Sequence, residues 1–378
     1  MVATSTDNIR RTAVLQISKA LYLLARPALF RLSPQQAHER TLRLLALSDS
    51  SKAVQNLLCF IHKTTFAPCP VSIGGVSLPY PFILAAGFVK GHGFADETEA
   101  LNAVHNAINI IPGWRSMPAL VGSVEFGSFT RWPRLGNSGV VMWRDASTRS
   151  TQNRVGLKNP GVKAAATFLD QRRDLLPPVF GINVAVSPGV TDPEQEQDEI
   201  LQALDAFLSL NLHPSWITLN LSCPNTEDDP TSNQTEHKAR TLCAAAVQHI
   251  GESIPLWVKI SPGLAANQYR VLMQAFAEVG VRAVIATNTL SQPVPGESSL
   301  TAGVGGGRLH AEALTAARHL MAEKQRHGFT VDVIGCGGVD DPASYQDFAR
   351  LGVNVVQYWS ILIYRGPLAS ALLLDEMG

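Results

Sequence analysis

The chain has 378 residues, of which 46% are hydrophobic and only 16% charged, so it can bury a large core and general disorder is excluded. Its 31 basic residues balance 31 acidic ones, which argues against a protein that binds nucleic acid through a basic surface. The five cysteines form no CxxC pair, so we expect no disulfide framework, no zinc or other metal site, and a reducing compartment.

The first fifty residues predict two amphipathic helices. Apolar side chains recur at spacings of three and four over residues 13–30. Ser33, Pro34 and Gln36 then have the pattern of a capped helix start. Basic residues outnumber acidic ones up to Lys52, which together with an apolar face suits an anionic membrane surface. A helical hairpin packed on the main domain fits the periodicity equally well.

The chain therefore divides into three parts. We expect residues 1–52 to form a helical extension suited to a membrane surface, residues 53–81 a linker with a short hairpin at Gly74 and Gly75, and residues 82–378 the main domain. No uninterrupted apolar run approaches the length of a membrane span, so we expect peripheral attachment and no transmembrane segment.

Short apolar runs recur from residue 82 and predict parallel strands buried on both faces. Helical patterns separate them, as over residues 267–279 and 311–326. Eight such units favour an α/β fold, a closed (β/α)8 TIM barrel with an N-terminal two-helix extension. The predicted strands are Phe82–Ala86, Ala119–Ser123, Val179–Val184, Trp216–Leu221, Leu256–Ile260, Ala283–Thr287, Val331–Ile334 and Val355–Tyr358.

Lysines and carboxamides stand where several of these runs end. Because the carboxyl ends of barrel strands form the active site of such folds, these groups should converge. Burying them together leaves donors and acceptors unpaired unless a polar ligand is bound, so we expect a small, flat ligand rich in amide and anionic groups. The residues are Lys90 after the first run, Asn183, Asn220, Lys259, and Thr287 to Thr289.

The last two runs carry a phosphate-binding pattern. Gly335 to Gly338 follow the seventh run, and Trp359 and Ser360 follow the eighth. Barrels often hold a phosphate there on backbone N–H groups. With Lys259 across the barrel mouth, the pattern suggests a phosphorylated flavin over the strand ends.

The ordered motifs resemble those of dihydroorotate dehydrogenases, specifically the quinone-dependent, membrane-associated class, over nearly the whole chain. The motifs are the segment 30–39, Asn153 to Gly156, Gly181 to Asn183, Asn220 to Asn225, Ala286 to Thr289, Gly335 to Gly338, and Tyr364 to Pro367.

The resemblance implies an FMN-dependent oxidoreductase of pyrimidine biosynthesis. It would oxidise dihydroorotate to orotate and pass electrons to a membrane quinone, on the cytoplasmic side of the inner membrane in a bacterium or on the mitochondrial inner membrane in a eukaryote. Cys223 would be the catalytic base, with Lys90 beside it; a thiol needs less pKa tuning for this role than a serine hydroxyl.

The resemblance also implies the binding residues. The FMN set is Ala86, Gly87, Lys90, Ser123, Asn183, Asn220, Lys259, Thr287, Gly306, Gly337, Gly338, Trp359 and Ser360. The substrate set is Lys90, Asn153, Asn220, Asn225, Asn288 and Thr289. The resemblance makes the extension of residues 1–52 face the quinone, and His38 and Arg144 match positions at the quinone site.

Some features depart from the family pattern. Cysteine at the base position is usual in the soluble class, Val89 replaces an aspartate, the segment from Lys90 to Ser123 is longer, and residues 226–230 form an acidic loop. These leave open a divergent enzyme that desaturates or reduces another cyclic amide or a carrier-bound substrate. A flavin-binding membrane-surface protein without turnover is the alternative outside enzymology.

Overall fold

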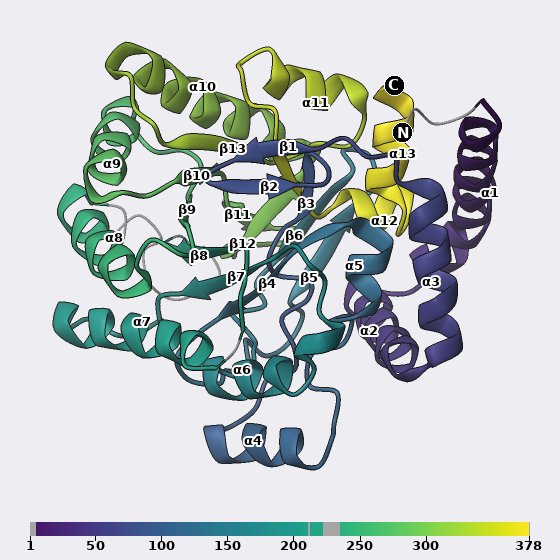
Figure 1. The fold of residues 1–378 in the computed structure, drawn as a ribbon, viewed down its shortest axis with the longest axis horizontal. Helices are drawn as coiled ribbons and strands as arrows, with labels where there is room; N and C mark the ends of the chain where they lie inside the picture. Colours follow the sequence, from purple (N-terminus) through teal and green to yellow (C-terminus); the bar gives the residue numbers. More distant parts are fainter. Residues whose placement is uncertain (1–4, 211, 222–234, 378) are drawn as a thin grey trace.

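The computed structural model describes residues 5–210, 212–221 and 235–377. Its centre is a closed barrel of parallel strands, which confirms the predicted (β/α)8 fold (Figure 1). Around the barrel the strands run β10, β13, β14, β3, β4, β7, β8 and β9. They are β3 (Phe82–Leu84), β4 (Ser123–Phe129), β7 (Phe180–Ala185), β8 (Trp216–Asn220), β9 (Leu256–Ile260), β10 (Ala283–Ala286), β13 (Asp332–Cys336) and β14 (Val356–Tyr358).

Helices cover the outside of the barrel (Figure 1). Apolar side chains on their inner faces join the strands in one large core. They are α4 (Glu97–His105), α5 (Ser116–Val121), α6 (Val162–Asp170), α7 (Pro193–Leu208), α8 (Glu236–Ile250), α9 (Ala266–Val279), α10 (His310–His327), α11 (Pro342–Ala349), α12 (Ile361–Arg365) and α13 (Ala369–Met377), with short 3-10 turns at Arg173–Leu175 and Gly307–Leu309.

The second predicted strand, Ala119–Ser123, was wrong. Most of that run belongs to helix α5, and β4 begins only at Ser123. The run is too short for periodicity to separate a strand from one buried helical turn. As a consequence, Ser123 lies at the amino end of its strand, and Ser128 stands near the carboxyl end.

A hairpin closes the amino end of the barrel, as the Gly74 and Gly75 turn predicts. Its strands are β1 (Val71–Ile73) and β2 (Val76–Leu78), which pair antiparallel. Trp257 donates its indole N–H to the Gly74 carbonyl at 3.0 Å and stacks on Trp216, so two buried aromatic rings fill this end. A side chain at Gly74 would overlap the Trp257 ring, which explains the glycine.

An antiparallel sheet that the sequence did not predict stands over the carboxyl end of the barrel. It runs in the order β11 (Leu290–Val294), β12 (Glu297–Gly306), β6 (Ser150–Asn153) and β5 (Met142–Asp145). Within the sheet, the Gln152 side chain of β6 donates to the Gln292 carbonyl of β11 at 2.8 Å. The sheet brings residues from two distant parts of the chain to one side of the barrel mouth.

Three N-terminal helices lie together beside the barrel (Figure 1). They are α1 (Ser5–Phe30), α2 (Pro34–Ser50) and α3 (Lys52–Thr65). The capping box is confirmed, since the Gln36 N–H donates to Ser33 Oγ at 3.2 Å. Helix α3 corrects the prediction of a linker from residue 53: its apolar positions recur at helical spacing and its start is capped by Ser51.

A buried carboxylate fastens this extension to the barrel. Asp49, near the end of α2, is 4% exposed. It accepts hydrogen bonds from the Gly113 N–H at 2.7 Å, from the Ser116 N–H and hydroxyl at 2.9 and 2.7 Å, and from Asn109 Nδ2 at 2.9 Å. These donors belong to the long segment between Lys90 and Ser123, so that segment anchors the helices.

Asp49→Asn should therefore lower the free energy of unfolding by about 2–3 kcal/mol, because an amide accepts fewer of these bonds and directs a donor at N–H groups. Urea unfolding measures the loss. The same substitution at the exposed helix cap Asp96 should cost less than about 0.5 kcal/mol. Equal losses at the two sites would contradict the anchoring role.

Candidate functional site

A cavity of about 480 Å³ lies between the carboxyl end of the barrel and helices α1 and α2. Strand-end residues line one side of it. Apolar residues of the two helices, such as Leu29, Phe30 and Leu44, line the other. The cavity is therefore polar toward the barrel and apolar toward the extension.

Most of the predicted site residues within the described chain line this cavity. They are Ala86, Gly87, Lys90, Asn153, Asn220, Lys259, Thr287, Asn288, Thr289, Gly306, Gly337, Gly338, Trp359 and Ser360, together with His38 and Arg144.

Four predicted residues are not among them. Ser123 lies at the far end of β4, and Asn183 is fully buried in the middle of β7, behind the cavity wall. Cys223 and Asn225, as well as the acidic loop, lie outside the described residues. The chain reaches the cavity at Asn220, three residues before the predicted base.

Lys259 is held by a buried relay in the barrel. Its ammonium donates to Gln357 Oε1 at 2.9 Å, and Gln357 Nε2 donates to the carboxylate of Glu125 at 3.0 Å. Glu125 is fully buried and also accepts from Trp216 and Thr218, at 2.9 and 2.7 Å. Such a carboxylate is tolerated inside a barrel because donors surround it.

The carboxamides at the barrel mouth are oriented by one another. Asn288 donates to Asn220 Oδ1 at 3.4 Å, Asn220 donates to Ser128 Oγ at 3.2 Å, and the Thr289 N–H donates to Asn288 Oδ1 at 2.8 Å. The ends of β8 and β10 thereby present amide groups in fixed orientations, and β4 supplies a hydroxyl that supports them. This arrangement suits a planar ligand with carbonyl, N–H and carboxylate groups.

Glycines shape the opposite end of the polar wall. A Cβ at Gly337 would lie 2.6 Å from the Ala313 side chain, and one at Gly338 would lie 2.6 Å from His310 and 3.0 Å from the Gly306 carbonyl. Only glycine fits these positions, and the backbone itself forms the surface. We call Gly305, Gly306, Gly337 and Gly338, which share this wall with Ser360, the glycine cradle; it is typical of phosphate binding by N–H groups.

Three buried polar atoms in residues of the cavity wall have no partner within the described chain. They are Gln152 Oε1, Thr289 Oγ1 and Asp340 Oδ1. A buried acceptor or hydroxyl left in this state is costly unless a ligand satisfies it. The wall therefore fits a bound molecule that carries hydroxyl and amide groups as well as a phosphate.

The apolar side of the cavity contains two polar groups, His38 and Arg144. Arg144 lies over the Phe30 ring, 3.9 Å from its centroid, and donates to the Phe30 carbonyl at 3.0 Å. His38 packs edge-on against Phe88. Burial, with the positive charges of Lys90 and Lys158, lowers the pKa of His38 to about 4, so its ring is neutral at pH 7.

Sequence reasoning missed several residues of the wall. Gln357 sits inside a strand read as wholly structural, and Ser128 was lost with the misplaced second strand. Arg149, Thr151 and Asp340 come from loops and from the unpredicted sheet. Of these residues, only Asp340 had a signal in the sequence, because it comes two residues after the glycine cluster.

The closed barrel, the amide-rich strand ends and the glycine cradle define a barrel enzyme that binds a phosphorylated cofactor. Comparison with known proteins makes the class specific. The family model described as dihydroorotate dehydrogenase matches residues 69–378. The chain is 30% identical over 357 residues to the dihydroorotate dehydrogenase (quinone) of Marinobacter nauticus, covering 92% of this chain and 96% of that one. It is 31% identical over 358 residues to the enzyme of the same name from Chromobacterium violaceum, covering 92% and 94%.

This chain belongs to the dihydroorotate dehydrogenase family. A crystal structure of DHODH from Eimeria tenella in complex with ferulenol is also similar, with a TM-score of 0.73 at 21% identity over 93% of each chain. That likeness supports the fold. Family members use FMN, and the residues present fit this cofactor: a cradle for its phosphate, unpartnered polar atoms for its hydroxyl groups, and Lys259 for its ring.

The pKa of His38 predicts a pH effect on stability. Since the unfolded histidine binds a proton near pH 6.5 and the folded one only near pH 4, this residue lowers stability as the pH falls from 7 to 5. His38→Gln should reduce that acid-induced loss by about 1–2 kcal/mol, measured by urea unfolding at the two pH values. His105→Gln, at an exposed position on α4, is the control and should leave the loss unchanged. An unchanged loss in His38→Gln would contradict the buried, neutral ring.

Proposed function

We propose that this protein oxidises dihydroorotate to orotate with FMN as cofactor and passes the electrons to a membrane quinone. The observation that carries the proposal is the single cavity with two unlike walls. Its polar wall suits a planar anionic amide and the cofactor. Its apolar wall, built from α1 and α2, suits the hydrophobic quinone.

The substrate is held by groups of the polar wall. Lys90 supplies a positive charge for the carboxylate, and Asn153, Asn220 and Asn288 supply amide donors and acceptors for the ring. Because the mutual bonds of Asn220 and Asn288 fix their orientation, they bind without first reorganising.

The reaction removes one proton and one hydride from adjacent ring carbons and leaves the double bond of orotate. When bound, FMN would supply the acceptor for the hydride, and the two electrons with two protons would convert the quinone to the quinol. We assign to Cys223 the removal of the proton from the carbon beside the carbonyl, because it stands at the base position of the family motif from Asn220 to Asn225. Lys259 would hold the flavin ring, and its hydrogen bond to Gln357 fixes the position of its ammonium group. His38 and Arg144 bind the quinone.

Anaerobic titration with dihydroorotate tests this function. The yellow protein should bleach with one orotate formed per flavin, and a quinone analogue should restore the colour. Cys223→Ala should bleach about 10²- to 10⁴-fold more slowly while it keeps its flavin, as expected for loss of a general base.

A flavin that stays oxidised in dihydroorotate would exclude this substrate. Bleaching by another cyclic amide or a carrier-bound substrate would then identify a divergent member of the family.

Attachment to the membrane is peripheral in this proposal, on the cytoplasmic face of the inner membrane in a bacterium or on the mitochondrial inner membrane in a eukaryote. Within the described residues, 8–30 form a helix long and apolar enough to cross a bilayer. That helix, however, is bound along its length to the C-terminal segment, through Arg11 to Asp375, Lys19 to Glu376 and Tyr22 to the Ile363 carbonyl. Its exposed leucines face outward, Leu24 being 78% exposed.

Replacing Leu21 and Leu24 with Glu should lower binding to anionic vesicles at least tenfold, because each leucine loses its burial in lipid. Co-sedimentation measures the binding. Flavin reduction by dihydroorotate should not change, since neither residue lines the cavity. Leu175→Glu, at an exposed position away from α1, is the matched control and should bind vesicles as wild type does. Wild-type binding by the double variant would rule out α1 as the attached surface.

A further inference from the structure

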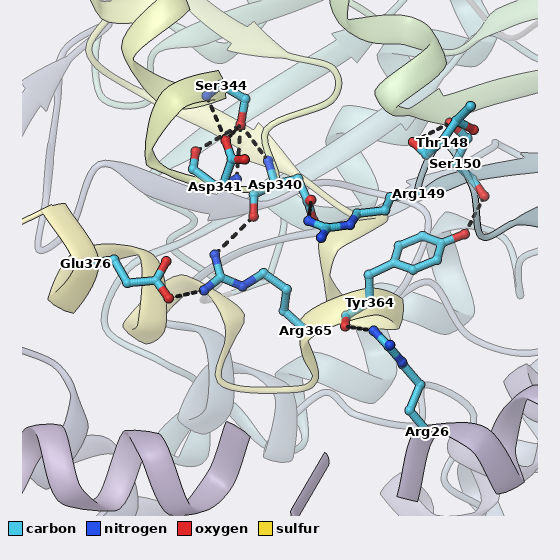
Figure 2. Close-up of polar contacts among 10 residues, drawn as sticks. All are labelled: Arg26, Thr148, Arg149, Ser150, Asp340, Asp341, Ser344, Tyr364, Arg365 and Glu376. Carbon is cyan, nitrogen blue, oxygen red and sulfur yellow. Dashed lines mark hydrogen bonds and ion pairs between the residues drawn. The ribbon is translucent and has the colours of Figure 1, made fainter. Parts of the chain in front are cut away.

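An ion pair between Arg149 and Asp340 lies on the cavity wall (Figure 2). Arg149 is in the turn between β5 and β6, and Asp340 comes two residues after Gly338. The Arg149 side chain is 55% exposed, and such pairs add little to stability. Stability therefore gives no strong reason for an arginine here.

The pair stands next to the glycine cradle. A Cβ at Gly306 would lie 2.4 Å from the Arg149 carbonyl oxygen, so these two backbones touch. Gly306 in turn touches Gly338, whose added Cβ would lie 3.0 Å from its carbonyl. Arg149 thus flanks the cradle on one side, and Asp340 continues it on the other.

The Arg149 turn is held firmly by its neighbours. Tyr364 donates its hydroxyl to the Ser150 carbonyl at 2.7 Å, as Figure 2 shows, and the Arg308 N–H donates to Ser150 Oγ at 2.9 Å. Arg149 itself has a φ of +50°, which a residue with a side chain adopts only when the surroundings impose it.

Asp340 is held just as firmly. Its N–H donates to Ser344 Oγ at 2.9 Å, and its carbonyl accepts from Arg365 at 3.0 Å (Figure 2). Arg365 is itself paired with Glu376 of the last helix. Both partners of the ion pair are therefore placed by rigid backbone.

The other cations of the cavity wall lie at other parts of it. Lys259 donates to Gln357 inside the barrel, Arg144 lies against Phe30, and Lys90 follows the first strand. Arg149 is the cation of this wall that adjoins the cradle. A guanidinium carries five N–H donors in a planar fork, enough for a carboxylate and a phosphate at once.

We propose that Arg149 binds the phosphate of the cofactor at the edge of the glycine cradle, and that Asp340 holds the arginine in position for it. This inference rests on the proposed use of FMN. A phosphate monoester carries nearly two negative charges at pH 7, and the backbone N–H groups of a cradle neutralise them only in part. Arg149 supplies the remaining positive charge.

The test compares FMN with riboflavin, which has the same ring and hydroxyl groups but no phosphate. Binding to the full-length protein, stripped of flavin and reloaded, is followed by flavin fluorescence. Arg149→Gln should weaken FMN binding at least tenfold and change riboflavin binding less than twofold. Arg149→Lys keeps the positive charge but not the planar guanidinium, so its FMN affinity should lie between those of wild type and Arg149→Gln. It also replaces Arg149→Gln in the test if that variant does not fold.

Arg308→Gln is the matched control, because Arg308 is exposed, lies two residues after Gly306 and pairs with Gln292. It should bind FMN as wild type does. Wild-type FMN affinity in Arg149→Gln would overturn the inference. Equal losses of FMN and riboflavin affinity would also overturn it, because the ion pair would then only hold the Arg149 turn in place. A wild-type protein that binds FMN tightly but is not reduced by dihydroorotate would contradict the proposed function and leave the phosphate contact intact.

Discussion

The polar interior of this barrel depends on the Glu125 carboxylate. An ionised carboxylate can only accept hydrogen bonds, so each neighbour must turn a donor toward it. Gln357 does so with its amide nitrogen and therefore presents its oxygen to Lys259, while Asn183 donates at 2.7 Å. The orientation of the lysine at the barrel mouth thus follows from a charge buried deeper in the strands. Without those donors, a charge in this place would be too costly to bury.

Most of the barrel could be predicted from the sequence, because strands buried on both faces leave continuous apolar runs. The prediction failed where the length of an apolar segment did not distinguish a strand or a linker from a helix. Ala119–Ser123 is as apolar as a strand but forms the end of a helix, and Lys52–Thr65 was read as a linker although its apolar spacing is helical. The sheet formed by β5, β6, β11 and β12 was missed because its burial alternates only weakly and its partners are far apart in the chain.

The site was predictable to the extent that it lies at strand ends. Position at or shortly after the end of an apolar run was enough to find Lys90, Asn220 and Lys259, since barrel topology brings the carboxyl ends of all strands to one face. Arg149 and Gln357 have no such signal. Arg149 reaches the wall through a turn whose place is set by Tyr364, more than two hundred residues later, and Gln357 is recognisable only from the carboxylate it contacts.

The placement of α1 and α2 against the barrel mouth also limits access to a flavin bound there. Apolar side chains such as Leu29 and Leu44 form the lateral wall of the chamber, on the side away from the strand ends. An electron acceptor that approaches a cofactor at the strand ends from this side would therefore pass between apolar side chains, which favours a lipid-soluble molecule over a water-soluble one. Removing the two helices would expose the same side of the chamber to bulk water.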